Sequence, residues 1–135
     1  MGFVISFEVS PVVSSDALNE LFASAWEEHS TTDFDVLLER SQFYICAFDK
    51  DVLVGFVKFI GDGGMHGFLL DTTVHAEYQK QGIGQELVRR CLKVAKEQNI
   101  SWVHVDYEAH LENFYTKCGF RPTKAGLVNL ERYKG

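Results

Sequence analysis

The stretch that decides the fold is residues 74–100, VHAEYQKQGIGQELVRRCLKVAKEQNI. It opens at the end of an apolar run, crosses a polar turn that contains Gly82 and Gly84, and continues as a long amphipathic pattern. From Ile83 to Ala95, apolar residues recur at helical spacing while the opposite face is charged. The pattern predicts a helix over 82–98 that starts directly at a Gly-x-Gly turn.

A Gly-x-Gly turn at the mouth of a helix is either a phosphate cradle or an ordinary tight turn. Backbone N–H groups and the positive end of the helix favour an anion at such a place. Two well-known nucleotide loops fit poorly here. Leu87 stands where the dinucleotide fingerprint has its third glycine, and Gln85 and Glu86 stand where the P-loop has Lys and Ser or Thr. The turn alone leaves both alternatives open.

The rest of the chain predicts seven strands and four helices in one α/β domain over residues 1–135. The expected strands are 3–9, 43–49, 52–60, 66–75, 101–106, 120–123 and 127–133, and the other helices are 16–28, a short one through 36–38, and 110–118. This order predicts a mixed, mostly antiparallel sheet. Strands 66–75 and 101–106 should be parallel neighbours, because a helix connects them by a right-handed crossover.

Two segments resemble motifs of the GNAT superfamily of acyl-CoA-dependent N-acetyltransferases. The family's motif A, (Gln/Arg)-x-x-Gly-x-(Gly/Ala), is matched by Gln79, Gly82 and Gly84, with Val74 five residues earlier. The segment LENFYTKCGF, residues 111–120, resembles motif B, which is typically FYxKxGF. The resemblance implies a GNAT-type domain whose sheet splays apart at its centre, between strands 66–75 and 101–106.

The resemblance implies acetyl-CoA as co-substrate. The turn around Gly82 would hold the pyrophosphate, Lys80 would add charge or simply be solvated, and the main chain of Thr72 and Val74 would pair with the pantetheine arm. The residues expected to bind the coenzyme are Thr72, Thr73, Val74, Gln79, Lys80, Gln81, Gly82, Ile83, Gly84 and Gln85.

Acyl transfer to an amine also needs an acid for the leaving thiolate and a partner for the carbonyl oxygen. Tyr115 occupies the motif B position of the family's general acid, although a tyrosine there also suits packing. The Val74 N–H is the expected partner of the carbonyl oxygen. The role of Tyr115 and that of Val74 both rest on the resemblance.

The general base is less evident. The resemblance implies that a Glu or His can serve as base on the strand before the turn, an even number of residues before the motif's valine. Those positions here are Thr72, Leu70 and Phe68, and none of them is a base. Asp71 has the opposite parity, so its side chain is expected to point away from the acetyl group, in a structural or an orienting role.

Other candidates lie outside that strand. Glu108 stands seven residues before Tyr115, where many family members have Asn. It would accept a hydrogen bond from a pantetheine amide, or it would act in catalysis by binding or deprotonating the acceptor amine, and His110 lies close enough in sequence to pair with it. Trp26, His29 and Phe34 fall in the region that forms one wall of the acceptor pocket in the family. His29 is a possible base by its pKa, or a solvated loop residue.

Composition and charge narrow the class of protein. Residues 1–50 carry nine acids against two bases, which disfavours nucleic acid and favours a cationic acceptor, or simply keeps the protein in solution. Neither a signal peptide nor a membrane-spanning run is present in the sequence. Cys46, Cys91 and Cys118 form no metal pattern and read as reduced, so a cytoplasmic protein without metal is expected.

The leading hypothesis is an acetyl-CoA-dependent N-acetyltransferase for a small amine, as a monomer or a homodimer. A second hypothesis is a coenzyme A-binding sensor of the same fold without turnover. A hydrolase that uses Cys118 and His110 fits poorly, because nothing near Cys118 favours a thiolate.

Overall fold

The computed structural model describes residues 4–135, whose contacts form two compact units that divide between residues 105 and 106. The first unit contains β1 (Ile5–Val9), α1 (Ser15–Ala25), α2 (Phe34–Arg40), β2 (Phe43–Asp49), β3 (Val52–Gly61), β4 (His66–Val74), the 3-10 turn η1 (Ala76–Tyr78), α3 (Ile83–Glu97) and β5 (Trp102–His104). The second contains the 3-10 turn η2 (Ala109–Leu111) and α4 (Glu112–Lys117). The long helix predicted over 82–98 is therefore confirmed. The beginning of the strand predicted at 3–9 falls outside the described residues.

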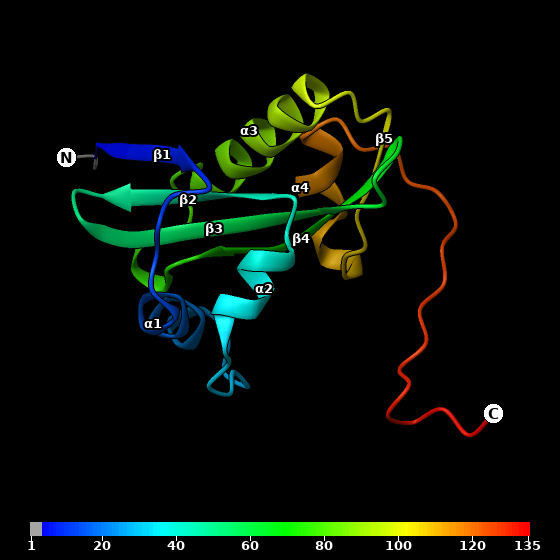
Figure 1. The fold of residues 1–135 in the computed structure, drawn as a ribbon, viewed down its shortest axis with the longest axis horizontal. Helices are drawn as coiled ribbons and strands as arrows, with labels where there is room; N and C mark the ends of the chain where they lie inside the picture. Colours follow the sequence, from blue (N-terminus) through cyan, green and yellow to red (C-terminus); the bar gives the residue numbers. More distant parts are fainter. Residues whose placement is uncertain (1–3) are drawn as a thin grey trace. The chain divides into compact units, whose positions relative to one another are not determined.

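The sheet has the strand order β1-β2-β3-β4-β5 (Figure 1). The pairs from β1 to β4 are antiparallel, whereas β4 and β5 are parallel neighbours, as predicted. Helix α3 covers one face of this sheet, and α1 and α2 cover the other. The four predicted helices are confirmed.

The prediction of about seven strands is wrong, because the sheet has five. Residues 120–123 and 127–133 form no strand. Near the end of the chain the backbone hydrogen bonds are local, such as the one from Arg132 N–H to the carbonyl of Asn129. Leu127, Val128 and Leu130 are largely exposed. Their apolar pattern satisfies strand propensity, but a strand also needs a partner and a face to bury.

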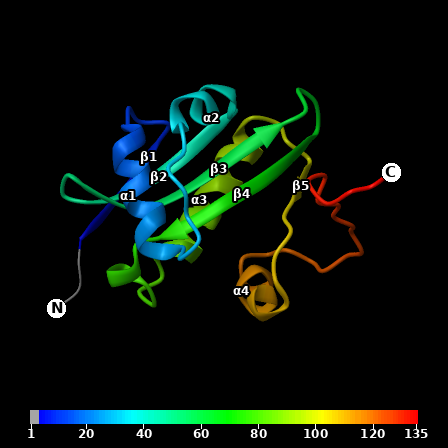
Figure 2. The ribbon, with the colours of Figure 1, turned by 90° about the horizontal axis from the view of Figure 1, so that it is seen from below.

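The parallel contact between β4 and β5 is short. It runs from His66 opposite Trp102 to Phe68 opposite His104. The remainder of β4, residues 69–74, has no strand partner on that side among the described residues, and Figure 2 shows β5 beside only one end of β4. The sheet therefore leaves an unpaired edge on β4, at the place where the resemblance predicts a splay.

Both faces of the sheet are buried by apolar side chains. The face under α1 and α2 holds a cluster of Leu18, Leu21, Phe22, Phe34, Cys46, Leu53 and Phe56. On the other face, α3 buries its predicted apolar stripe, including Leu87 and Cys91. Helix α3 approaches closely at Gly55, where an added Cβ would lie 3.0 Å from a methyl carbon of Leu87.

A β-bulge interrupts β4. Phe56 of β3 pairs with Thr73, but Lys58 pairs with Leu70, so one residue of β3 faces two residues of β4. Asp71 lies in this bulge with a φ of 61°, in the left-handed region. The bulge reverses the alternation of side chains, so Leu70 and Thr73 share the face of Phe56 and Lys58. Counting in twos from Val74 therefore gives the wrong face for Leu70 and Phe68, which lie beyond the bulge.

Candidate functional site

The N-terminus of α3 presents free backbone N–H groups. Gly82 precedes the helix with a φ of 83° and provides no side-chain cap. The first helical hydrogen bond runs from the N–H of Glu86 to the carbonyl of Gly82, 3.1 Å. The N–H groups of residues 83–85 therefore have no partner among the described residues. An added Cβ on Gly82 would meet no atom within 4 Å, so the conformation, and not lack of room, requires glycine.

The loop before α3 is fastened to the rest of the unit. The side-chain amide of Gln79 donates to the carbonyl of Val74, 3.1 Å, and the hydroxyl of Tyr78 donates to Asp49 Oδ2, 2.7 Å. That hydrogen bond to Asp49 raises the pKa of Tyr78. Ser24 Oγ of α1 accepts from the N–H of Ala76, 3.3 Å. Gln79 thus holds the loop against the strand end, while Lys80 is exposed.

The unpaired edge of β4 carries a polar atom that lacks a partner. Thr72 Oγ1 is buried and makes no hydrogen bond within the described chain. Because buried polar groups are almost always satisfied, this hydroxyl indicates that a ligand or water completes the site. An extended chain of amides, such as a pantetheine arm, can pair with a strand edge of this kind. The edge, the orphan hydroxyl and the free N–H groups of α3 together fit an acyl-CoA.

The three residues predicted to line the acceptor pocket have different surroundings. Trp26 follows the end of α1 and is half exposed, and its indole N–H donates to Thr73 Oγ1, 3.2 Å. His29 Nε2 lies 2.8 Å from Asn19 Oδ1. Phe34 is only 3% exposed, and its ring lies 4.9 Å from that of Phe22 in the core cluster. Of the three, Trp26 presents the most surface to a ligand.

The bulge brings together two charged residues that the sequence did not connect. Lys58 Nζ lies 3.1 Å from Asp71 Oδ2. The Lys58 side chain is only 13% exposed, whereas that of Asp71 is 42% exposed. The one available signal was an aspartate inside a strand pattern, because Asp is depleted in strands and tolerates the left-handed region.

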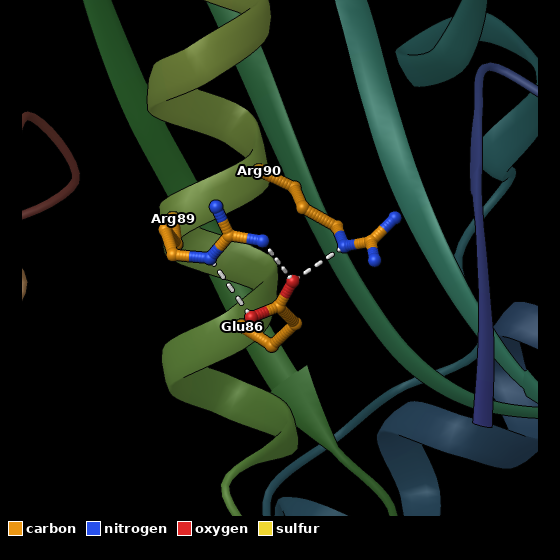
Figure 3. Close-up of polar contacts among 3 residues, drawn as sticks. All are labelled: Glu86, Arg89 and Arg90. Carbon is orange, nitrogen blue, oxygen red and sulfur yellow. Dashed lines mark hydrogen bonds and ion pairs between the residues drawn. The ribbon is translucent and has the colours of Figure 1, made fainter. Parts of the chain in front are cut away.

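A charged cluster joins the first turn of α3 to the next (Figure 3). Glu86 accepts hydrogen bonds from Arg89 and Arg90, with Nε of Arg90 2.6 Å from Glu86 Oε2. The hydrogen bonds from Arg89, and then those from Arg90, lower the pKa of Glu86 to about 2. The guanidinium of Arg90 also lies 4.5 Å from the ring centre of Phe7 on β1. Two guanidinium groups against one carboxylate give this cluster a net positive charge.

The second unit holds the two predicted catalytic residues. Tyr115 lies on α4 and is 7% exposed, and its ring stacks on Tyr107 at 5.0 Å and meets the edge of Phe120 at 5.8 Å. Glu108 precedes η2, and its Oε2 lies 3.5 Å from His110 Nδ1. Gly119, with a φ of 103°, follows the C-terminal end of α4, where glycine is common because it adopts the left-handed conformation easily.

The cysteines offer no nucleophile. Burial raises the pKa of both Cys46 and Cys91 to about 12, and burial also raises the pKa of Cys118. Over residues 4–135, no cluster of three or more His, Cys, Asp or Glu side chains has the arrangement of a metal site. Nor does any helix in that range have the length and apolarity to cross a membrane.

Comparison with known proteins gives a consistent result. The model of the Acetyltransferase (GNAT) family matches residues 15–120. A rice protein, the probable glucosamine 6-phosphate N-acetyltransferase 2 of Oryza sativa subsp. japonica, is 38% identical over 63 residues, or 47% of this chain and 38% of the rice protein. The chain spans between 31% and 66% of the lengths of the curated relatives it matches.

Solved structures share the fold. A GNAT family acetyltransferase from Streptococcus pneumoniae superimposes with a TM-score of 0.78 at 25% identity, covering 93% of this chain and 98% of that one. A Bacillus subtilis acetyltransferase in complex with CoA superimposes with a TM-score of 0.69 at 22% identity, covering 87% of this chain and 77% of that one.

Proposed function

Since the chain belongs to the GNAT family of acetyltransferases, we propose that it transfers the acetyl group of acetyl-CoA to the primary amine of a small acceptor. The observation that carries this proposal is the uncapped N-terminus of α3 next to the unpaired edge of β4. The first suits a diphosphate, and the second suits the amides of a pantetheine arm.

We propose that each part of the donor meets a different group of the first unit. The N–H groups of residues 83–85 receive the pyrophosphate, and the net positive charge around Glu86 favours it. The arm lies along residues 69–74 of β4, where the hydroxyl of Thr72 gains the partner it lacks. The thioester then lies near Val74, whose N–H polarises the carbonyl oxygen.

The proposed reaction is direct attack. The acceptor ammonium first loses a proton to solvent, and the free amine forms a bond with the thioester carbon. The nitrogen then gives up its second proton to solvent, the tetrahedral intermediate collapses, and the carbon–sulfur bond breaks. Tyr115 gives its phenolic proton to the departing sulfur; a phenol, with an ordinary pKa of about 10, is a suitable donor to a thiolate. Tyr115 is proposed for this role from its place in motif B.

The acceptor is proposed to be a small amine, and two observations bear on its type. The named rice relative is a probable glucosamine 6-phosphate N-acetyltransferase, which favours an amino sugar. The acidic residues of the first 50 favour a cationic amine without phosphate. A panel must therefore include glucosamine 6-phosphate, glucosamine, spermidine and kanamycin.

The test follows thiol release from acetyl-CoA with this panel, together with calorimetric binding of CoA. We expect turnover of at least one amine, and a Tyr115→Phe variant that binds CoA normally but turns over on the order of 100-fold more slowly. Tyr107→Phe, which removes a phenol from the neighbouring ring, serves as the matched control and should stay within about twofold of the wild type.

Two other outcomes would contradict the proposal. CoA binding without thiol release for any amine would favour the non-catalytic coenzyme A sensor. A failure to bind CoA would show that the turn before α3 is only structural.

A further inference from the structure

The bulge in β4 directs a carboxylate toward α1 and α2. Lys58 alternates along β3 with Val57 and Phe59, and its strand partner Tyr44 contacts the cluster under those two helices. The Lys58 side chain therefore leaves the sheet on that face. Because Lys58 Nζ lies 3.1 Å from Asp71 Oδ2, the Asp71 carboxylate lies on that face too.

Only half of the Asp71 carboxylate is used by the protein. Oδ2 is held by Lys58, whose side chain is nearly buried and has little freedom. Oδ1 makes no hydrogen bond or ion pair with the described residues, and the side chain is 42% exposed. A carboxylate fixed at one oxygen and open at the other is ready to accept from an ammonium group.

Hydrogen bonds connect the main chain of Asp71 to the exposed indole of Trp26. Trp26 donates to Thr73 Oγ1, and Thr73 Oγ1 donates to the main-chain carbonyl of Asp71, 2.9 Å. Thr73 itself is 2% exposed, so this connection is rigid. Trp26 and Asp71 thus lie on one side of β4, and Asp71 belongs to the unpaired stretch of its edge.

We propose that Asp71 is the residue on which the acceptor amine docks, and that Lys58 is the positioning residue that fixes it. The inference rests on the proposed function. The acceptor's ammonium donates to Asp71 Oδ1, while Trp26 covers the carbon atoms beside the nitrogen. This places the amine next to the edge where the thioester carbonyl is proposed to lie, and the chemical class selected is a primary amine carried on a small neutral or cationic body.

The decisive variant is Asp71→Asn, because Asn also tolerates the left-handed conformation and so preserves the bulge. We measure KM for the amine that the wild type acetylates fastest among glucosamine, glucosamine 6-phosphate, spermidine and kanamycin. KM for that amine should rise at least tenfold, while KM for acetyl-CoA and the calorimetric affinity for CoA stay within twofold. Asp62→Asn, an equal change of charge in the β3–β4 turn, should change neither KM.

Lys58 is tested by two variants. Lys58→Met should reproduce the higher amine KM, and Lys58→Arg should restore it to within about threefold of the wild type. A merely structural ion pair would instead lower thermal stability and change both KM values together. If Asp71→Asn has the same KM for the amine as the wild type, the inference is wrong while the proposed function is unaffected. If the wild type binds CoA but acetylates no amine, the proposed function fails and this inference with it.

Discussion

Replacing Glu86 by Gln removes the carboxylate that joins Arg89 and Arg90 at the start of α3. The pKa of Glu86 falls from an ordinary 4.5 to about 2 in the folded protein, chiefly through the hydrogen bonds from Arg89. That fall corresponds to roughly 3 kcal/mol of preference for the charged form. Arg89 is 62% exposed, however, and exposed ion pairs contribute at most about 1 kcal/mol each. We therefore expect Glu86→Gln to lower the free energy of unfolding by about 1–2 kcal/mol at pH 7.

The effect must depend on pH with a definite sign. Because the folded pKa of Glu86 lies below the unfolded one, its contribution is fully present above about pH 5 and is lost as pH falls toward 2. At pH 3.5 the difference between wild type and variant should have shrunk to roughly half of its value at pH 7. Salt at 1 M should reduce the difference as well, since the cluster faces solvent.

Guanidinium or urea unfolding, followed by circular dichroism at pH 7 and pH 3.5, measures both differences; urea avoids the added ionic strength. Glu97→Gln, near the other end of α3, is the matched control. Glu97 makes no salt bridge with the described residues and lies at the negative end of the helix, so its loss should be neutral or slightly stabilising. A Glu86→Gln difference that is absent at pH 7, or equal at the two pH values, would refute the reasoning.

Two further predictions concern the core. Gly67→Ala would place a methyl group 1.9 Å from the ring of Phe59. We expect this clash to lower the free energy of unfolding, measured in urea, by about 2–3 kcal/mol. The control is Gly64→Ala, whose methyl group would meet only Asp62 at 3.4 Å, and it should lower that free energy by less than about 1 kcal/mol. Burial raises the pKa of Cys46 to about 12, so in the folded protein at pH 8 this thiol should react with thiol reagents only as fast as the protein unfolds. Mass spectrometry measures the labelling, and rapid labelling of Cys46 would contradict its burial.

The sequence predicted best where one local pattern decides the structure. The stripe from Ile83 to Ala95 defines a helix by its spacing alone, and Gly82 marks its start because the turn needs a positive φ. The segment at 127–133 has strand-like residues as well, but strand formation depends on a partner that no local pattern reveals.

The candidate site was likewise predicted where a local motif defines it and missed where it depends on strand pairing. The loop before α3 and the position of Tyr115 on its helix follow from motifs, and both were located correctly in the fold. The pair of Lys58 and Asp71 was missed, because it depends on the register between β3 and β4, which no local pattern reveals. The faces of Leu70 and Phe68 were assigned wrongly, because one extra residue in β4 reverses the alternation beyond the bulge. Parity is a reliable guide along an uninterrupted strand, and a bulge invalidates it without any change in composition.

The unpaired stretch of β4 has a consequence for the behaviour of the protein in solution. A strand edge with free backbone groups is a template on which another chain can add, and the residues 69–74, LLDTTV, are mostly apolar or β-branched. The left-handed residue Asp71 interrupts the flat geometry that such addition needs, and its charge opposes a dry contact between chains. The bulge therefore disfavours aggregation through this edge, and a ligand bound along the edge would disfavour it further by occupying the same backbone groups.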